Sequence, residues 1–156
     1  MAQKWNVQNM KRYLKIHVAV NIKTREILAL EVTDEKVHDG RMLKKLVDQV
    51  STSSSDKKNN KTIIIKAVLA DGVFDTNRNF RYLEEKRIKP GIKVRKNSIV
   101  SSTSNNRLRN KEVMMLLQTN DLLKWKTRKK YGHRWIAPET VFSTMKRTFG
   151  EHVSAT

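Results

Sequence analysis

Residues 66 to 76 read KAVLADGVFDT and hold the clearest structural signal in the chain. The apolar run at 62–70 ends abruptly at Asp71, and a second aspartate follows at Asp75. Such a run predicts a strand buried on both faces, as in a central or parallel position of a sheet. Asp-Gly is typical of a turn, whereas a carboxylate at the end of a buried strand is typical of a metal site. Both interpretations of Asp71 stay open, and Asp75 or Thr76 is expected to cap the next helix.

Upstream of this strand, two runs of alternating polarity predict an antiparallel hairpin. Leu14, Ile16, Val18 and Val20 alternate with other residues, and ILALEV at 27–32 repeats the pattern after a short polar connection. A period of two is that of a half-buried strand, and a short loop between two such strands makes them antiparallel neighbours. We expect the face that carries these apolar side chains to be the buried one.

Helical spacing appears on both sides of the buried strand. The apolar residues within 42–50 recur at helical intervals, and Asp39 is placed to cap the N-terminus of that helix. Residues 75–86 predict a second helix, with Phe80 and Leu83 on its inner side.

The last third of the chain adds a short strand and two helices. PGIKVRK at 90–96 is a strand candidate, and 108–127 has helical spacing. A final helix is expected to have Pro138 in its first turn and to end at Gly150. The order hairpin, helix, strand, helix, strand, helix, helix predicts a mixed α/β fold, with an antiparallel hairpin, parallel strands and packed helices.

Charge is the strongest signal in the composition. The 156 residues include 33 Lys and Arg against 15 Asp and Glu, for a formal net charge of +18. Every charged residue from Lys86 to Lys111 is basic, and the same holds from Lys124 to Arg134. Such an excess attracts polyanions, of which nucleic acid is the commonest. An anionic membrane surface, or simply solvated basic faces, are the alternatives.

Several other classes of protein are excluded by the composition. No apolar run approaches the ~18 residues of a membrane span, and the N-terminus has no signal-peptide pattern. The chain has no cysteine, which excludes disulfides and thiolate metal sites. We therefore expect a cytoplasmic protein without a membrane partner.

Glu139 is the second acidic residue of interest. It lies in YGHRWIAPETVFSTMK at 131–146, which also holds Tyr131, Arg134 and Lys146. Glu139 and Lys146 are seven residues apart, close to two helical turns, so they share one side of a helix. An acid in a first helical turn complements the helix dipole, and an acid and a lysine on one side commonly form a surface pair. Opposite a second acid across a cleft, they could instead hold a metal ion and a phosphate.

Three blocks of the sequence resemble a known family. They are YLKIHVAVNIKTREILALEVTDEKVHDGRML at 13–43, VLADGVFDT at 68–76 and ETVFSTMKRTFG at 139–150. In this order, and over nearly the whole chain, they resemble prokaryotic insertion-sequence transposases of the DDE type. The resemblance implies a ribonuclease H-like catalytic domain, in which two aspartates and a glutamate hold Mg²⁺ or Mn²⁺. It also implies DNA as the partner, both transposon ends and target, and a nucleoid-associated location.

The resemblance assigns roles to individual residues. Asp71 matches the second aspartate and Glu139 the glutamate, so both would be catalytic and would bind the metal. Tyr131, Arg134 and Lys146 resemble the tyrosine, arginine and lysine that accompany the glutamate, although the interval from Arg134 to Glu139 is one residue longer than usual.

These basic residues would contact the DNA backbone. Arg134 and Lys146 would hold the scissile phosphate or its neighbour. The basic runs, including Arg95 and Lys96, would carry the flanking DNA.

The family's first aspartate lies on a strand before the hairpin. In this chain no acidic residue precedes Glu26, and residues 1–12 have neither an apolar strand pattern nor a carboxylate. We expect 1–12 to be a non-catalytic leader and 13–156 to be a partial ribonuclease H-like domain, incomplete at its N-terminus, from a truncated or split gene. Such a chain should be weak or inactive as a nuclease by itself and should expose an unpaired sheet edge.

Three functions remain as hypotheses. The first is a transposase catalytic-domain fragment, with Asp71 and Glu139 as its remaining ligands. Besides DNA, the partner expected is a second copy, in a homodimer, or a full-length transposase. The second is a non-catalytic basic DNA-binding fragment, a remnant or inhibitor of a full-length transposase. The third, a small basic RNA-binding protein of ribosomal type, explains the charge but not the placement of Asp71 and Glu139.

Overall fold

The computed structural model describes residues 13–53, 64–101, 106–119 and 122–150, and the predicted leader at 1–12 lies outside them. Strands, helices and two short 3-10 helices alternate along the chain. In order they are β1 (Leu14–Val20), β2 (Ile27–Asp34), η1 (Asp39–Arg41), α1 (Met42–Ser53), β3 (Ala67–Ala70), η2 (Gly72–Phe74), α2 (Asn77–Glu85), β4 (Lys89–Ile92), α3 (Arg107–Thr119), α4 (Leu122–Lys129) and α5 (His133–Phe149).

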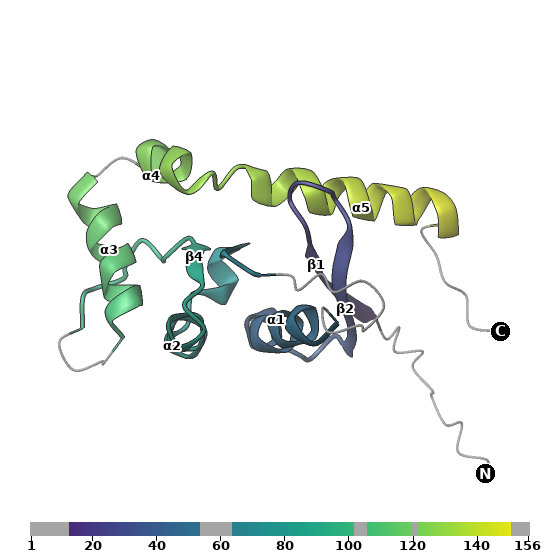
Figure 1. Ribbon diagram of the computed structural model, residues 1–156, viewed down its shortest axis with the longest axis horizontal. Helices are drawn as coiled ribbons and strands as arrows, with labels where there is room; N and C mark the ends of the chain where they lie inside the picture. Colours follow the sequence, from purple (N-terminus) through teal and green to yellow (C-terminus); the bar gives the residue numbers. More distant parts are fainter. Residues whose placement is uncertain (1–12, 54–63, 102–105, 120–121, 151–156) are drawn as a thin grey trace, which may run out of the picture.

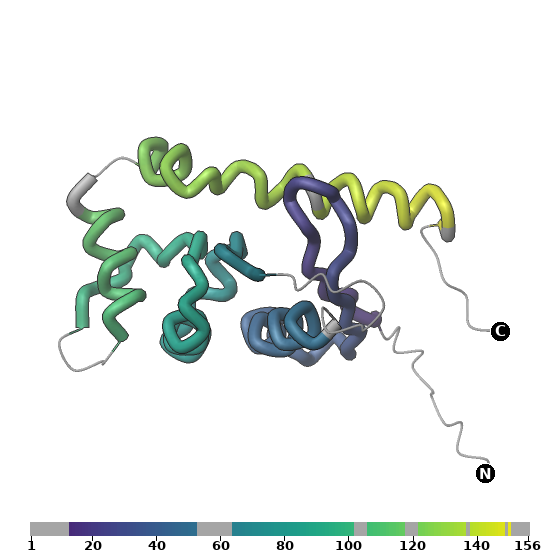
Figure 2. Tube along the Cα trace, viewed as in Figure 1, coloured from purple at the N-terminus to yellow at the C-terminus, as the bar shows by residue number. Residues whose placement is uncertain are grey.

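The described residues form three layers. In Figure 1, α1 and α2 lie below the strands, and the long helix α5 runs across above them. The tube in Figure 2 shows the β1–β2 hairpin rising from α1 toward α5, while α3 and α4 lie at the opposite end. The strands are therefore the middle layer, with helices on both sides.

The strands pair as predicted but make two small sheets. β1 pairs antiparallel with β2, and β3 pairs parallel with β4. The predicted mixed α/β class is confirmed. Among the described residues each sheet has two strands, and no strand pairing joins β1 to β3.

The strand before Asp71 is shorter than its apolar sequence predicts. β3 covers four residues, and Ile64, in the same apolar run, is largely exposed. The prediction of a strand buried on both faces is therefore wrong for this part of the chain. The physical reason is that, among the described residues, β3 pairs along one edge only, with β4, so it is an edge strand of a two-stranded sheet and its faces are only partly covered.

The hairpin buries the face that its sequence does not predict. Leu14, Ile16 and Val18 share a face, and 73% of the surface of Leu14 is exposed. α1 packs instead on the opposite face, which carries Ala19 and Ala29. Alanine allows a helix to approach a sheet closely, so α1 can bury its own large side chains on this face.

The main core lies where α1, α2, α3 and β4 meet. Phe80 and Leu83 of α2 are fully buried there, as predicted, and they pack with Val113 of α3. α1 contributes Leu43 and Val47 to this core. The neighbouring turn of α1 faces the hairpin, so one helix packs against both sheets.

The start of α1 differs from its prediction. His38, not Asp39, caps η1, because its Nδ1 accepts a hydrogen bond from Gly40 N at 3.1 Å. Asp39 instead faces the hairpin, where its carboxylate lies 3.4 Å from Lys15 Nζ. The prediction that Asp39 caps the helix is wrong, since η1 separates this residue from α1.

The C-terminal helices also differ in their boundaries. Residues 108–127 were expected to form one helix, and the structure has α3 and α4 in their place. α5 begins at His133, five residues before Pro138, so Pro138 lies inside the helix and Glu139 is not in its first turn. The predicted end is confirmed, because Gly150 has a φ of 80°, where glycine is favoured.

Asp75 is a buried ion-pair partner rather than a helix cap. Thr76 caps α2, since its Oγ1 accepts a hydrogen bond from Asn79 N at 3.2 Å. The Asp75 carboxylate is fully buried and receives Nε of Arg109 at 2.8 Å and the backbone N–H of Arg95 at 3.0 Å. These bonds tie α3 and the segment after β4 to the loop that follows Asp71.

We predict that Asp75→Ala strongly destabilises the fold. The substitution leaves the Arg109 guanidinium without its buried partner, which costs about 3–5 kcal/mol. Urea denaturation would measure this loss. Asp39→Ala is the matched control, because it removes an exposed pair worth less than about 1 kcal/mol. Equal losses in the two variants would contradict the structural role of Asp75.

A candidate metal and nucleic-acid site

Asp71 lies at the carboxyl end of β3, and its geometry is compatible with both interpretations of the sequence, a turn residue and a metal ligand. Its Oδ1 accepts a hydrogen bond from Gly72 N at 2.5 Å, so Asp71 caps the short helix η2 as a turn residue would. The same oxygen lies 3.2 Å from Nη1 of Arg134 on α5. The side chain is 57% exposed, which leaves the carboxylate accessible to a ligand.

Arg134 is held between two aromatic rings. Its guanidinium carbon lies 4.2 Å from the ring centre of Tyr131 and 4.3 Å from that of Trp135. Its Nη1 donates hydrogen bonds to the Tyr131 hydroxyl and to Asp71. The side chain is only 14% exposed, so the stacked rings give the cation a fixed position beside the aspartate.

Tyr131 connects this pair to the strand. It is buried, its ring packs edge-to-face on Trp125 with centres 4.9 Å apart, and its hydroxyl donates to the carbonyl of Ala70 at 3.3 Å. Burial raises the pKa of the Tyr131 phenol, and the nearby Arg134 charge opposes part of that shift. The network Asp71–Arg134–Tyr131–Ala70 therefore ties the end of β3 to the start of α5.

Glu139 lies on α5, exposed, five residues beyond Arg134. At 1.5 Å per residue this is about 7.5 Å along the helix axis, and five residues are more than one turn, so Glu139 points to a different side of α5 than Arg134. In the described ranges no three His, Cys, Asp or Glu side chains lie close enough together to hold a metal ion. The structure thus brings Asp71, Tyr131 and Arg134 together, and no direct contact joins them to Glu139.

The other predicted DNA contacts lie on exposed positions. Lys146 is two turns beyond Glu139 on α5, and Arg95 and Lys96 follow β4. Arg95 holds its place through its backbone N–H, which is bonded to Asp75, so its side chain is free to face solvent. The DNA-binding roles of these three residues stay predictions.

The donor chemistry of the two acids fits a divalent cation. Carboxylate oxygens are the hard ligands that Mg²⁺ and Mn²⁺ prefer, and both side chains are accessible. Two carboxylates alone are too few ligands to bind a divalent ion tightly, because tight sites commonly use several oxygen ligands. Asp71 and Glu139 are therefore candidates for part of a metal site.

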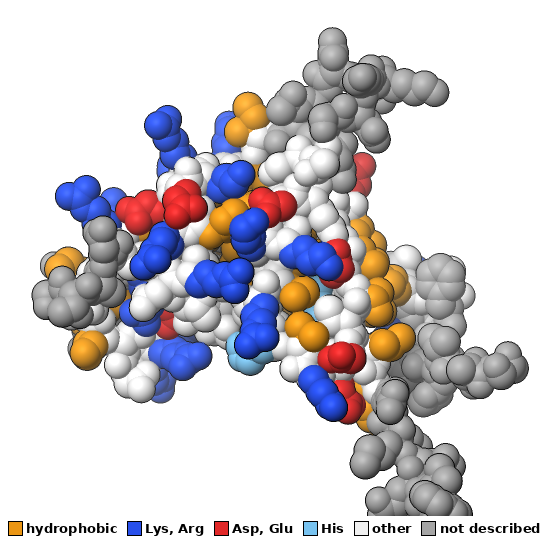
Figure 3. Space-filling model, turned by 90° about the horizontal axis from the view of Figure 1, so that it is seen from below, with side chains coloured by type: hydrophobic (Ala, Val, Ile, Leu, Met, Phe, Trp, Pro, Cys, Tyr) orange, Lys and Arg blue, Asp and Glu red, His pale blue; other side chains and the backbone are white. Residues whose placement is uncertain are grey.

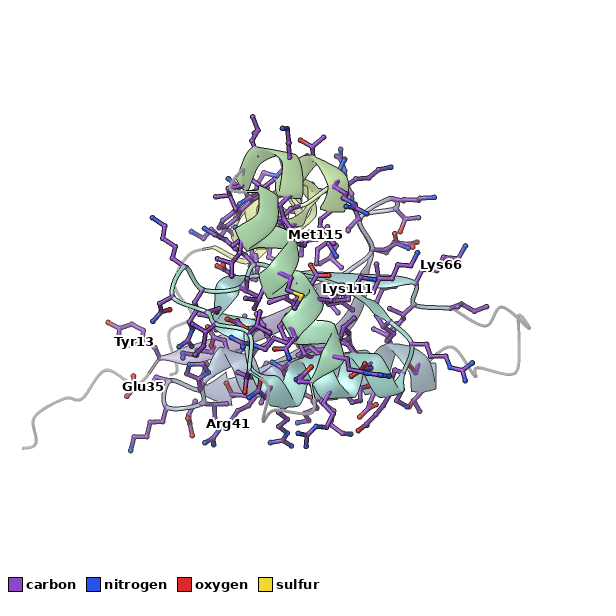
Figure 4. All side chains as sticks on the ribbon, turned by 90° about the vertical axis from the view of Figure 1, so that its left-hand side faces the viewer. Tyr13, Glu35, Arg41, Lys66, Lys111 and Met115 are labelled. Atoms are coloured by element: carbon purple, nitrogen blue, oxygen red, sulfur yellow. The ribbon has the colours of Figure 1, made fainter. Side chains whose placement is uncertain are left out.

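Basic side chains are spread over several faces of the molecule. Figure 3 views the side formed by α1 and α2, where Lys and Arg side chains alternate with Asp and Glu. In Figure 4, Lys111 and Met115 lie on the same outward side of α3, and Lys66 extends away near β3. The positive charge thus surrounds the core rather than forming one stripe, which favours a general attraction for polyanions.

An apolar cavity of about 320 Å³ opens beside the Asp71–Arg134 pair. We call it the central groove. Strand β1 lines one wall and β3 the other, while side chains of α1 and the start of α5 complete it. Representative lining residues are Val18, Val20, Leu46, Leu69, Trp135 and Pro138.

Reading the sequence alone missed the aromatic support of the site. Trp125 and Trp135 hold Tyr131 and Arg134 in place, yet they appear in the sequence as isolated tryptophans in a basic segment. The available signal was their spacing around Tyr131 and Arg134. That signal has meaning only once α4 and α5 are known to be separate helices.

These features define a class of protein and then a family. The class is a basic, mixed α/β domain with an acid at the carboxyl end of a parallel strand, where open α/β sheets commonly bind their ligands. The family model described as "Transposase DDE domain" matches residues 2–156. The chain therefore belongs to the transposase DDE domain family, and its fold is that of a ribonuclease H-like domain.

Membership implies DNA as the partner and a general use of divalent metal ions. Searches of curated proteins and of solved structures gave no significant match. Within the described ranges, no helix has the length and apolar character needed to cross a membrane.

We predict that Tyr131→Phe changes how stability depends on pH. A raised pKa means that the folded state favours the neutral phenol, so this stabilisation is present below about pH 10 and is lost as the pH rises further. The variant should lose about 1–3 kcal/mol near neutral pH, because Ala70 and Arg134 lose a buried partner. Between neutral and strongly alkaline pH, the free energy of unfolding should then fall less in the variant than in the wild type.

Urea denaturation at both pH values checks this prediction. Tyr13→Phe, at an exposed tyrosine, is the control and should follow the wild type at both. An alkaline loss that is the same in Tyr131→Phe and the wild type would contradict the assigned role of the buried phenol.

Proposed function

We propose that this chain takes part in DNA transposition by divalent-metal-dependent cleavage and transfer of DNA strands. The observation that carries the proposal is the network at the end of β3. There Asp71, which resembles the family's second aspartate, accepts a hydrogen bond from Arg134, and Arg134 lies on the same helix as Glu139, which resembles the family's glutamate. This arrangement supports the proposal, because an acid and a cation meet at the end of a parallel strand and a second acid lies on the helix that carries the cation.

Asp71 and Glu139 are the residues that would hold Mg²⁺ or Mn²⁺. Such an ion supplies charge stabilisation for the attacking and leaving oxygens of an in-line displacement at phosphorus.

The cations have a different task. Arg134 carries a planar guanidinium that binds phosphate oxygens in pairs, and its two stacked rings reduce the entropy lost on binding. Lys146 lies on the same helix and would contact a neighbouring phosphate as a point charge. Arg95 and Lys96 would extend the contacts along the DNA backbone.

The strength of the activity follows from the number of acids. The described residues contribute two candidate carboxylate ligands rather than three. We therefore expect weak cleavage by the chain alone and stronger DNA binding. A non-catalytic DNA-binding role is the second candidate function. It is favoured by the same observation, that there are two candidate carboxylate ligands rather than three.

We predict that Asp71 and Glu139 share one metal ion. With added hydrogen peroxide and ascorbate, Fe²⁺ bound in place of Mg²⁺ reduces the peroxide to hydroxide and a hydroxyl radical, which cuts the nearby backbone. Cuts should therefore appear around both residues and decrease when Mg²⁺ is added. Asp71→Ala or Glu139→Ala should remove both sets of cuts. Glu85→Ala, an exposed acid on α2, should leave them unchanged. Loss of one set without the other would mean that the two acids do not share an ion.

Nicking of supercoiled DNA in Mn²⁺ tests the reaction itself with the same variants. Slow nicking that Asp71→Ala and Glu139→Ala abolish, and Glu85→Ala keeps, would support the enzyme. Shared metal cuts without nicking would support the non-catalytic DNA-binding role.

We also predict a salt dependence for DNA binding. Each phosphate contact adds about 0.9 to the slope of log K against log salt concentration, so Arg95→Ala with Lys96→Ala should reduce the slope by about 1.8. The control pair is Lys44→Ala with Lys45→Ala, because these lysines are already paired with acids at 2.5 Å and 2.7 Å. Fluorescence anisotropy of a labelled duplex gives both slopes, and equal reductions would contradict the proposed contacts.

A further inference from the structure

A second cavity, of about 580 Å³, opens where β3, β4, α2, α3 and α4 meet. We call it the α3 cleft. It shares Ala67 and Leu69 with the lining of the central groove, and its other lining residues differ. Its size is within the range of roughly 300–1,000 Å³ that is usual for clefts that hold a ligand. Representative lining residues are Leu83, Arg87, Lys89, Lys111, Met115 and Arg128.

Cations from four separate segments converge on the α3 cleft. They are Arg87 just after α2, Lys89 of β4, Lys111 of α3 and Arg128 of α4. All four are exposed, and none of them forms an ion pair with an acid in the part of the chain that the structure describes. Like charges that converge repel one another, so this rim is complementary to an anionic partner.

Two acids also line the α3 cleft, and they do not cancel this charge. Glu112 is only 2% exposed, and its carboxylate accepts hydrogen bonds from Nζ of Lys129 at 2.5 Å and from Nε1 of Trp125 at 3.3 Å. The charges of Glu112 and Lys129 therefore cancel each other. Glu84, at the end of α2, is the other acid. Four rim cations less this one acid leave a net charge of +3 at the cleft.

The α3 cleft also has apolar walls. Leu83 is fully buried in its lining, and Leu69, Leu108 and Met115 are partly exposed there. Lys111 and Met115 are one helical turn apart, and Figure 4 shows them on the same side of α3. A cation and an apolar contact thus lie side by side, and a ligand that matches both must be anionic and apolar at once.

The edge of β4 beside the α3 cleft is closed to a further strand. The N–H of Lys89 bonds to the carbonyl of Lys66, just before β3, so the next residue, Pro90, has its backbone groups toward the opposite edge. Proline has no N–H to donate, and the Pro90 carbonyl already accepts a hydrogen bond from Nζ of Lys129 at 3.1 Å. A polypeptide that binds here must therefore satisfy its own backbone groups, as a helix does.

We propose that the α3 cleft binds an acidic amphipathic helix of a partner protein. Apolar side chains along one side of this helix contact Leu69, Leu108 and Met115, and the acidic residues that flank them face the rim cations. Methionine adapts to side chains of different shapes, which suits a cleft that receives a helix. The inference rests on the charge and shape of the cleft and not on the proposed catalysis.

DNA is the main alternative occupant, because it is the expected partner of this basic domain. A duplex offers phosphates to the rim cations but nothing apolar to the walls. Proteins that bind single strands commonly stack the bases on aromatic side chains, and none of the described residues that line the α3 cleft is aromatic. An acidic helix matches the cations and the apolar walls together.

The test uses the full chain and a synthetic helical peptide, in buffer with a chelator and without DNA. The peptide has about 14 residues, close to four helical turns, with leucines along one side, glutamates beside them and a fluorescent label. We expect saturable binding by anisotropy, which weakens as salt is added. Hydrogen exchange should show new protection in α3 and α4, and none in the β1–β2 hairpin.

Two altered peptides separate charge from apolar contact. Replacing the glutamates by glutamine should weaken binding by about tenfold or more, because the rim cations lose their partners. A scrambled peptide of the same composition keeps the charge but no longer has its leucines on one side, so it should also bind about tenfold more weakly. Equal binding of the scrambled peptide would overturn the proposal, since charge alone would then explain the attraction.

Matched protein variants place the binding site. Arg128→Glu reverses a charge of the rim, whereas Lys126→Glu reverses an exposed charge of the same helix outside the lining. Met115→Gln removes an apolar contact, whereas Met114→Gln alters the neighbouring exposed methionine outside the lining. Arg128→Glu and Met115→Gln should each weaken peptide binding by about tenfold, and the two controls by less than about twofold.

Urea denaturation shows whether each variant folds, and Arg128→Glu, at an exposed residue, decides the question if Met115→Gln does not. Absent peptide binding, or binding that both cleft variants leave unchanged, would overturn the proposal. A labelled DNA duplex, in a separate measurement, would assign the cleft to DNA if the peptide does not bind and Arg128→Glu alone weakens the duplex. Because the peptide measurements contain neither metal nor DNA, their failure leaves the proposed catalysis untouched.

Discussion

The packing of α1 against both sheets is the constraint on which this structure depends. No strand pairing links β1 to β3 in the described residues, so their relative position depends on the helices that contact both sheets, α1 and α5. Leu43 and Val47 of α1 belong to the core around α2 and β4, while Leu46 and Val50 pack on the hairpin. Helical spacing puts these two pairs on adjacent strips of the same helix. The helix therefore holds two half-sheets side by side and sets the width of the central groove.

The candidate site depends on a second link, between the end of β3 and α5. Tyr131 donates a hydrogen bond to the carbonyl of Ala70, and Arg134 donates one to the carboxylate of Asp71. Two successive residues at the end of β3 are therefore held by residues at the start of α5. The rings of Tyr131 and Trp135 keep the guanidinium from rotating. Any movement of α5 must move Arg134 relative to Asp71, and Glu139 with it. The geometry of the two acids is thus a property of how α5 packs.

The secondary structure that depends on local sequence pattern was predicted correctly. The features that depend on packing between distant elements were not. The alternation in 14–20 specifies a strand, and the β3–β4 pairing follows from two apolar runs around a helix. Which face of the hairpin is buried depends on where α1 packs, and that depends on the small residues Ala19 and Ala29. Alanine contributes little to an alternating pattern of apolar and polar residues, so that pattern predicted the wrong face of the hairpin as the buried one.

The site residues show the same division between local and distant information. The positions of Asp71 and Glu139 on a strand end and a helix could be inferred from the family resemblance. The role of Asp75 could not, because its partner Arg109 is 34 residues away and lies in a helix of its own. A carboxylate before a helix usually caps it, and here Thr76 takes that role and frees Asp75 for the ion pair.

The two aspartates of DGVFDT illustrate why burial decides function. Asp75 is enclosed and has its oxygens occupied by Arg109 and the Arg95 backbone, so it stabilises the loop and has no capacity left for a ligand. Asp71, four residues earlier, is more than half exposed and shares Arg134 with the polar end of the groove. Arg134 in turn has one donor, Nε, without an acceptor. Burial thus separates the two aspartates: the carboxylate of Asp75 is used up in holding the loop, whereas that of Asp71 is the one that a ligand can reach.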